Sequence, residues 1–186
     1  MLSSMPDRDT AAGDLGLVQA FVNTVDLQDG PEELTDAEAL RAWLIAHDLL
    51  PKAAGVTEAE LKHAIALREA MRGLIGGNSG LPVYPVVVAT LNEAAAQSRL
   101  RARFGPGGKA RLDPEAEGAV GALGRLVAAV YSAMQSADWE RLKLCDADTC
   151  RWVFYDRSKN HSSRWCRMAS CGNRAKARRF RQKQQK

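Results

Sequence analysis

Cysteine is absent from the first 144 residues of this 186-residue chain, and long apolar runs are absent throughout. The first residues hold no apolar stretch of signal-peptide length, so we expect no export into an oxidising compartment. No segment approaches the roughly 20 apolar residues that span a bilayer. These absences predict a soluble, cytoplasmic protein with no membrane partner.

Motifs of the common enzyme classes are also missing. The chain contains no nucleophile elbow, P-loop, zincin helix or dinucleotide-binding fingerprint. His47 and His63 are sixteen residues apart, with no cysteine or acidic cluster that would complete a metal motif. The sequence therefore predicts no catalytic residues, and the protein is not expected to be an enzyme.

The four cysteines form two pairs, each with four residues between its members: Cys145 with Cys150, and Cys166 with Cys171. Structural zinc is held by four soft donors, commonly as two close pairs. A segment as short as residues 141–186 cannot bury much core, so a metal cross-link would stabilise it. The pattern predicts one structural Zn²⁺ bound by these four thiolates. Two disulfides or four unrelated thiols are the alternative reading.

Charge is divided unevenly along the chain. Residues 141–186 carry fourteen Lys or Arg and three Asp, a net +11, whereas residues 1–140 carry twelve basic and nineteen acidic residues, a net −7. Together they give the +4 of the whole chain. Dense positive charge attracts polyanions, above all nucleic acid, through counterion release. The C-terminal segment is therefore predicted to contact nucleic acid, although a charge run can also be a solvated surface.

Residues 1–14 are polar and expected to be loose, whereas residues 15–140 show helical patterns with clear start and stop signals. Capping boxes at 35–38 and 57–60 open two helices. Alternating residues over 98–104 and 109–112, around a Gly-Pro-Gly-Gly turn, predict a β-hairpin. Helices are expected over 15–27 (or a strand there), from 35, from 57 to about 75, over 85–97, and from the signal Asp113-Pro114-Glu115. The N-terminal domain is thus predicted to be mainly α with one small β-hairpin.

Three polar residues, Asn23, Thr24 and Asp26, interrupt an apolar stretch near the N-terminus. They could line a pocket for a small-molecule effector, or they could cap or hydrogen-bond locally, as such side chains readily do. The N-terminal domain is accordingly a candidate for ligand sensing or for homodimerisation.

The C-terminal segment, residues 141–186, is expected to be a hairpin followed by a basic helix. A strand at 152–155 would turn at 156–163 and return at 164–168, and Cys171 would open the helix. The amides of Gly172 and Asn173 could then hydrogen-bond the zinc-bound sulfurs. One cysteine pair on each part predicts a treble-clef-like zinc finger with four cysteine ligands.

The run Arg164-Trp-Cys-Arg-Met-Ala-Ser-Cys-Gly-Asn-Arg-Ala-Lys176 resembles the CGNR zinc finger. Proteins with this finger typically carry an N-terminal ABATE domain and are described as proposed stress-induced transcription regulators. The stretches Phe21-Val-Asn-Thr-Val-Asp26 and Trp43-Leu44 are similar to that domain. The resemblance implies that the four cysteines bind zinc and that the C-terminus binds DNA.

The predicted DNA contacts lie mostly on the final helix. Arg174, Arg178 and Arg181 recur at i, i+4 and i+7 and share one face, while Ala177 and Phe180 are expected to pack on the hairpin. Most such contacts go to phosphates. The full set of predicted contacts is Arg164, Arg174, Lys176, Arg178, Arg179, Arg181 and Lys183.

The function predicted from these features is that of a zinc-containing, DNA-binding transcription regulator. An RNA-binding or ribosome-associated protein is one alternative, and a protein-interaction module with a purely structural zinc is another. Single-stranded RNA recognition requires exposed aromatic faces. The side chains that could provide them are Trp152, Phe154, Tyr155 and Trp165.

Overall fold

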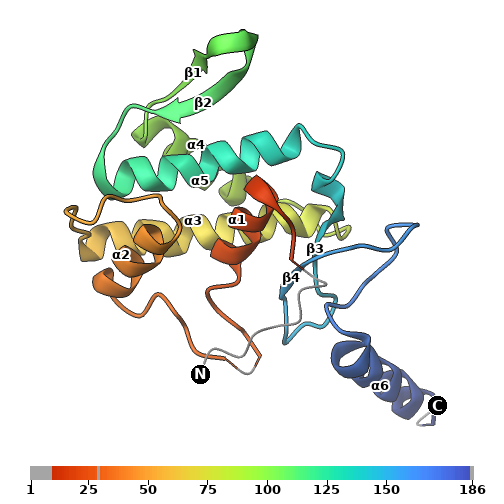
Figure 1. Ribbon diagram of the computed structural model, residues 1–186. Helices are drawn as coiled ribbons and strands as arrows, with labels where there is room; N and C mark the ends of the chain where they lie inside the picture. The colour runs from red at the N-terminus through yellow and green to blue at the C-terminus, as the bar shows by residue number, and fades with distance from the viewer. Residues whose placement is uncertain (1–9, 29, 185–186) are drawn as a thin grey trace.

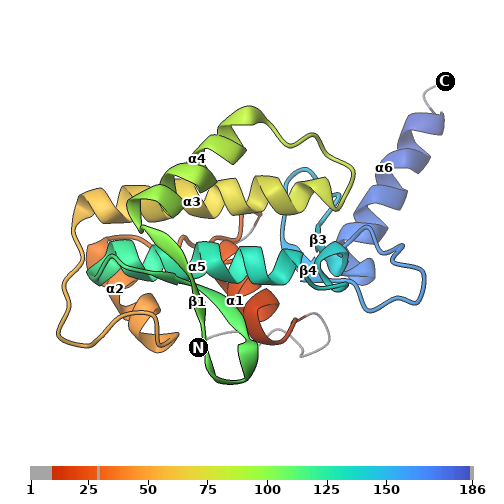
Figure 2. The same ribbon diagram turned by 90° about the horizontal axis from the view of Figure 1, so that it is seen from above.

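A computed structural model describes residues 10–28 and 30–184, apart from the side chain of Arg179. Helices α3, α4 and α5 pack side by side, and α1 packs on α3 and α5 (Figures 1 and 2). The helices of this part are α1 (Gly13–Val22), α2 (Ala37–Ala46), α3 (Glu58–Gly77), α4 (Pro85–Gln97) and α5 (Gly118–Met134). The predicted mainly helical N-terminal region is confirmed.

Residues 1–14 were predicted to be loose, but the first helix begins within this segment. Residues 1–9 of that segment lie outside the described residues, whereas Gly13 and Asp14 already belong to α1. The stretch 15–27 is helical only as far as Val22. None of the helices in the described ranges has both the length and the apolar character needed to cross a membrane.

A continuous apolar core joins the helices. Phe21, Leu40 and Met71 are completely buried in it, together with the inner stripe of α5. Met134, which was expected to point inward, is 45% exposed, because Ala133 occupies that stripe in its place. The prediction for Met134 was therefore wrong by one residue.

Local capping signals explain where two helices begin. At α3, the Thr57 hydroxyl accepts the amide of Glu60 at 3.3 Å and the Glu60 carboxylate accepts the amide of Thr57 at 2.7 Å, which confirms the predicted capping box. At α2 the predicted box is wrong, because Asp36 rather than Thr35 caps the helix. The Asp36 carboxylate accepts the amide of Ala39 at 2.8 Å.

The predicted hairpin is present as β1 (Leu100–Phe104) paired antiparallel with β2 (Ala110–Pro114), and it projects beyond the helices (Figure 1). Strand β2 includes Pro114, so the helix start predicted at residues 113–115 is wrong. The amides of Glu115 and Ala116 donate to the carbonyl of Ser98, and α5 begins only at Gly118. A long-range hydrogen bond has overridden a local signal here.

Helix α5 has a glycine where the base of this hairpin rests on it. A Cβ atom at Gly124 would lie 2.4 Å from the Cβ of Ser98, which is completely buried. Such a distance is far below van der Waals contact, so no larger residue fits without movement of the backbone. Gly124 therefore allows β1 and β2 to stay close to α5 at their base.

The C-terminal part contains β3 (Leu142–Leu144), β4 (Val153–Tyr155), a π-helical turn (Met168–Gly172) and α6 (Asn173–Gln184). Strand β4 pairs antiparallel with β3, not with residues 164–168 as predicted. The connection between β3 and β4, residues 145–152, is as long as the predicted turn 156–163, so loop length does not decide between the two pairings. A hairpin plus helix is nevertheless present, as expected for the finger. Leu142, Leu144 and Val153 complete the core of the helices, so the finger hairpin also joins the two parts of the molecule.

Candidate metal centre and nucleic-acid interface

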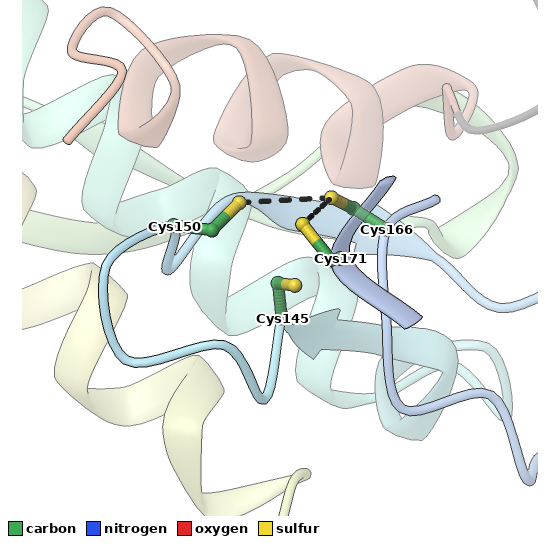
Figure 3. A group of neighbouring side chains, drawn as sticks. All are labelled: Cys145, Cys150, Cys166 and Cys171. Carbon is green, nitrogen blue, oxygen red and sulfur yellow. Dashed lines mark hydrogen bonds between the residues drawn. The ribbon is translucent and has the colours of Figure 1, made fainter. Parts of the chain in front are cut away.

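Four cysteines from separate parts of the finger converge on one point (Figure 3). All are free thiols, and their four Sγ atoms lie within 4.8 Å of one another. The Sγ of Cys166 is 3.7 Å from that of Cys150 and 3.8 Å from that of Cys171. Sulfurs at about 2.3 Å from a tetrahedral Zn²⁺ are about 3.8 Å apart. The thiol cluster thus fits one structural zinc ion, which would act as a cross-link.

The electrostatics of the cluster also favour a bound cation. Hydrogen bonds from Cys150 and Cys166 lower the pKa of the Cys145 thiol, against the opposing effect of burial. Hydrogen bonds to Cys145 and Cys150, and then burial, raise the pKa of the Cys166 thiol. Thiolates this close repel one another, so all four can ionise together only with positive charge between them. A zinc dication provides that charge.

Backbone amides support the sulfurs, but not those that were predicted. The amide of Gly172 donates to the carbonyl of Arg167 at 3.2 Å, and that of Asn173 donates to the carbonyl of Met168. The π-helical turn uses both amides within itself, so the predicted hydrogen bonds to sulfur are absent. Instead, the amides that approach sulfurs are those of Ala147 and Cys166 at Cys145, and that of Trp152 at Cys150.

A buried carboxylate, Asp156, orders the loop between the two cysteine pairs. Its side chain accepts the amides of Ser158 at 2.9 Å and Ser163 at 3.0 Å, and the ammonium group of Lys143 at 3.1 Å. Burial by itself raises the pKa of Asp156, but hydrogen bonds from Ser158, Ser163 and Lys143 outweigh it and lower the pKa. Asp156 was not predicted as a site residue, although the Asp-x-Ser spacing is that of an Asx turn.

We expect Asp156→Asn to lower the free energy of unfolding by about 3 kcal/mol, because it leaves the largely buried Lys143 without its negative partner. The folded-state pKa of Asp156 lies below its unfolded value, so its stabilisation is present at neutral pH and is lost on acidification below about pH 4. Denaturant unfolding of zinc-loaded protein at several pH values checks this. The variant should lose less stability with acid than the wild type. Equal acid sensitivity would contradict the prediction, and Asp148→Asn, at an 83% exposed side chain, is the control.

Asn23 fastens the finger hairpin to the helices. Its side-chain amide donates to the carbonyl of Val153 at 2.7 Å and accepts the amide of Val153 at 2.9 Å, so it pairs with β4 as another strand would. Thr24 is buried and donates to the carbonyl of Phe21 at 2.9 Å. Both side chains therefore make hydrogen bonds within the fold.

Asp26, the third residue of the predicted pocket, lies elsewhere. Its carboxylate accepts the amide of Gln28 at 2.9 Å. It borders a hollow of about 190 Å³ next to the thiol cluster, which Trp152 and Arg174 also line. The structure thus does not gather Asn23, Thr24 and Asp26 around one cavity.

Two buried arginines, Arg68 and Arg72, were not identified from the sequence. Arg68 is 3% exposed and makes two hydrogen bonds, of 2.6 and 2.7 Å, to the carboxylate of Glu32. Arg72 is 5% exposed and donates to the carbonyls of Val22 in α1 and Arg151 in the finger. For Arg68 the sequence did carry a signal, because Arg68 is the charged member of the stripe that α3 buries, residues 61, 64, 68, 71 and 75. Arg72 links three parts of the chain.

Helix α6 projects away from the rest of the molecule (Figures 1 and 2). Its first basic residue is already engaged, since the guanidinium of Arg174 donates to Sγ of Cys171 at 3.1 Å and to the side chain of Gln28. Arg178 lies 3.8 Å from the carboxylate of Asp148. The face predicted to contact DNA is therefore turned toward the finger over its first turns.

The other predicted DNA contacts on α6 are more exposed to solvent. Lys176, Arg181 and Lys183 are exposed, whereas the side chain of Arg179 lies outside the described residues. Phe180 is 62% exposed, so its expected packing on the hairpin is wrong. Beyond its first turns, α6 thus presents cationic side chains and one aromatic ring to solvent.

Arg164, the one predicted DNA contact outside α6, and the aromatic side chains of the finger already have partners within the fold. Arg164 pairs with Asp146, and its guanidinium lies 5.4 Å from the centre of the Trp165 ring. Phe154 is 2% exposed, and Trp152 and Trp165 are partly buried around the cysteines. Tyr155 packs partly against the core of the helices. Phe154 is therefore buried, and the other three aromatic residues are only partly accessible for stacking.

Comparison with known families agrees with this arrangement. One family model, the CGNR zinc finger, matches residues 141–184, and a second, ABATE, described as "Putative stress-induced transcription regulator", matches residues 15–142. A search among curated proteins found no match. The two families describe a regulator and a zinc finger rather than an enzyme. The chain therefore belongs to the ABATE family and carries a CGNR zinc finger with one structural zinc ion in its C-terminal part.

Proposed function

We propose that this protein is a DNA-binding transcription regulator whose zinc finger presents α6 to the phosphate backbone of a duplex. Cys145, Cys150, Cys166 and Cys171 hold the zinc, and the closed four-thiolate shell leaves no position for catalysis. The observation that carries the proposal is the projecting helix itself. It has six basic and no acidic residues between Asn173 and Gln184, and the π-helical turn that contains Cys171 anchors it.

Zinc supports the helix as well as the finger. A helix of 12 residues is marginally stable by itself in water. Like charges at i and i+4, as at Arg174 and Arg178, weaken it further. The thiol cluster fixes its N-terminal end, and a polyanion would relieve the repulsion along its length. Binding to DNA should thus stabilise α6.

A duplex fits this surface better than single-stranded RNA. The aromatic residues around the cysteines are packed in the fold, so they offer few stacking faces. Basic side chains on a projecting helix suit phosphate contacts on both sides of a groove. Phe180 is exposed on α6, but one ring does not provide the successive stacking faces that single-stranded RNA recognition uses, so we favour DNA over RNA.

The N-terminal helices would regulate the finger, by binding an effector or a second copy of the chain. Asn23 from the end of α1 and Arg72 from α3 both hydrogen-bond the backbone of the finger. A shift of either helix would therefore reach the residues next to Cys150. We also propose that this regulator acts in a stress response, as its family description indicates, and in the cytoplasm, where thiols stay reduced and free to bind zinc.

The proposal is tested by selecting bound sequences from random duplex and single-stranded libraries with the intact, zinc-loaded protein. Duplexes should be enriched, and Lys176→Gln/Lys183→Gln should weaken their binding about tenfold or more, since each lost phosphate contact removes released counterions. Lys52→Gln/Lys62→Gln is the matched control, at two exposed lysines far from the finger in sequence. Enrichment of single strands alone would favour RNA binding. No enrichment at all would leave the protein-interaction reading.

A further inference from the structure

The β1–β2 hairpin forms a cationic arm that projects from the otherwise acidic N-terminal part of the molecule. Between residues 99 and 113 there are five basic residues and one acidic residue, a net +4. The remaining residues of 1–140 carry seven basic and eighteen acidic residues, a net −11. The basic residues of the arm are Arg99, Arg101, Arg103, Lys109 and Arg111. Nearly half of the basic residues of this part of the chain are thus gathered on one hairpin.

The strand register places the arginines on one face of the arm. Arg103 lies directly opposite Arg111, and Arg101 lies opposite Asp113. Successive side chains of a strand point to opposite faces, so Arg101 and Arg103 share a face with these partners. Like charges directly opposite each other destabilise a hairpin. The Arg103 and Arg111 pair is therefore unfavourable for the stability of the hairpin itself.

The nearby carboxylates only partly neutralise this face. Arg111 pairs with Asp113 at 2.8 Å and Arg101 with Glu115 at 3.0 Å, while Arg103 lies 3.8 Å from Asp113. Two carboxylates thus serve three guanidinium groups. The three arginine side chains remain 58–72% exposed, so they are open to a further anion.

The tip of the arm is apolar. Phe104 is 80% exposed and is followed by the turn Gly105-Pro106-Gly107-Gly108. A two-stranded ribbon fits the major groove of DNA, and Phe or Pro side chains can wedge between base pairs from the minor groove. The arm therefore combines arginines for phosphates with an apolar tip for a groove.

We propose that the β1–β2 hairpin is a second nucleic-acid contact, in which Arg101, Arg103 and Arg111 bind phosphates of a duplex and Phe104 enters a groove. This inference rests on the proposed function and extends it. The hairpin and α6 lie at opposite ends of the molecule (Figure 1), so the arm would lengthen the bound site or hold a separate segment of DNA. Its net positive charge favours a polyanion as the partner.

The test compares salt dependence of duplex binding in full-length, zinc-loaded variants. Arg103→Gln/Arg111→Gln removes the two opposed charges, so repulsion in the hairpin falls, and the exposed pair with Asp113 contributes little to stability. The slope of log K against log salt should become shallower by about 2, because each phosphate contact contributes about 0.9. Phe104→Ser should weaken binding without changing the slope. Lys52→Gln/Lys62→Gln is again the control.

Several results would overturn the inference. An unchanged slope for Arg103→Gln/Arg111→Gln, together with weaker binding by Lys176→Gln/Lys183→Gln, would reject the arm and leave the proposed function intact. Loss of self-association in sedimentation with an unchanged slope would assign the arm to a second copy of the chain. If the wild-type protein binds no nucleic acid, the proposed function fails along with the inference. Thermal unfolding of each variant verifies that the fold is kept.

Discussion

Removal of zinc is expected to unfold the finger while the central helices stay folded. Binding of a structural zinc contributes about 10–16 kcal/mol to small zinc-dependent folds at neutral pH. Without it, the four close thiols lose their cross-link and α6 loses its anchor. Amide signals from residues 145–184 should collapse in NMR spectra after chelation, while signals from α3 and α5 keep their dispersion.

Cys171→Ser should reproduce this result with zinc present, and Ser170→Ala, one residue away, should not. The purified wild-type protein should contain about one zinc per chain, as a single four-cysteine shell requires. A metal-free protein that keeps dispersed signals for residues 145–184 would show that the cysteines are not needed to hold the finger.

Arg72→Met is expected to lower the free energy of unfolding by about 3 kcal/mol, because it leaves two backbone carbonyls at the junction without their donor. The variant would leave Glu69 and the carbonyls of Val22 and Arg151 without the guanidinium. Burial lowers the pKa of Arg72, against the opposing effect of Glu69, but an arginine stays charged at neutral pH. Denaturant unfolding with saturating zinc measures the change.

Lys62→Met is the matched control for this variant, since Lys62 lies exposed on the same helix. Exposed substitutions usually change stability by no more than about 0.5 kcal/mol. Faster hydrogen exchange in β4 of Arg72→Met would locate the loss at the junction with the finger. A change of less than about 1 kcal/mol would mean that other contacts at the junction replace the guanidinium.

The sequence predicted best those elements whose signals are local. The helix over 58–77 begins at a capping box that its own first turn completes, and the helix over 85–97 begins at a proline suited to the first turn. The start signal at Asp113 failed because the distant carbonyl of Ser98 holds the chain in an extended form there. Likewise, the partner of β4 could not be assigned from composition, since the two candidate connections, 145–152 and 156–163, are equally long.

In the candidate site, too, the features with a local sequence signal were predicted and those that depend on distant residues were not. The spacing of the cysteines was sufficient to predict the thiol cluster, because two close pairs are the usual arrangement for zinc. The orientation of α6 was not predictable, since Arg174 is held by Gln28, which is 146 residues away in the sequence. The role of Arg72 at the junction was missed because its long-range partners are the backbone carbonyls of Val22 and Arg151, which carry no sequence signal.

The most direct test of the central claim is the affinity of the intact protein for a labelled duplex, measured over a range of salt concentrations before and after zinc removal. We expect the zinc-loaded protein to show a log K against log salt slope of about −3.6 or steeper, equivalent to four or more phosphate contacts. Chelation should weaken this binding strongly and make the slope shallower, because only the contacts of the β1–β2 hairpin would keep their structure, and restored zinc should recover it. An affinity that does not depend on salt, or that is the same with and without zinc, would contradict a zinc-held helix that binds DNA.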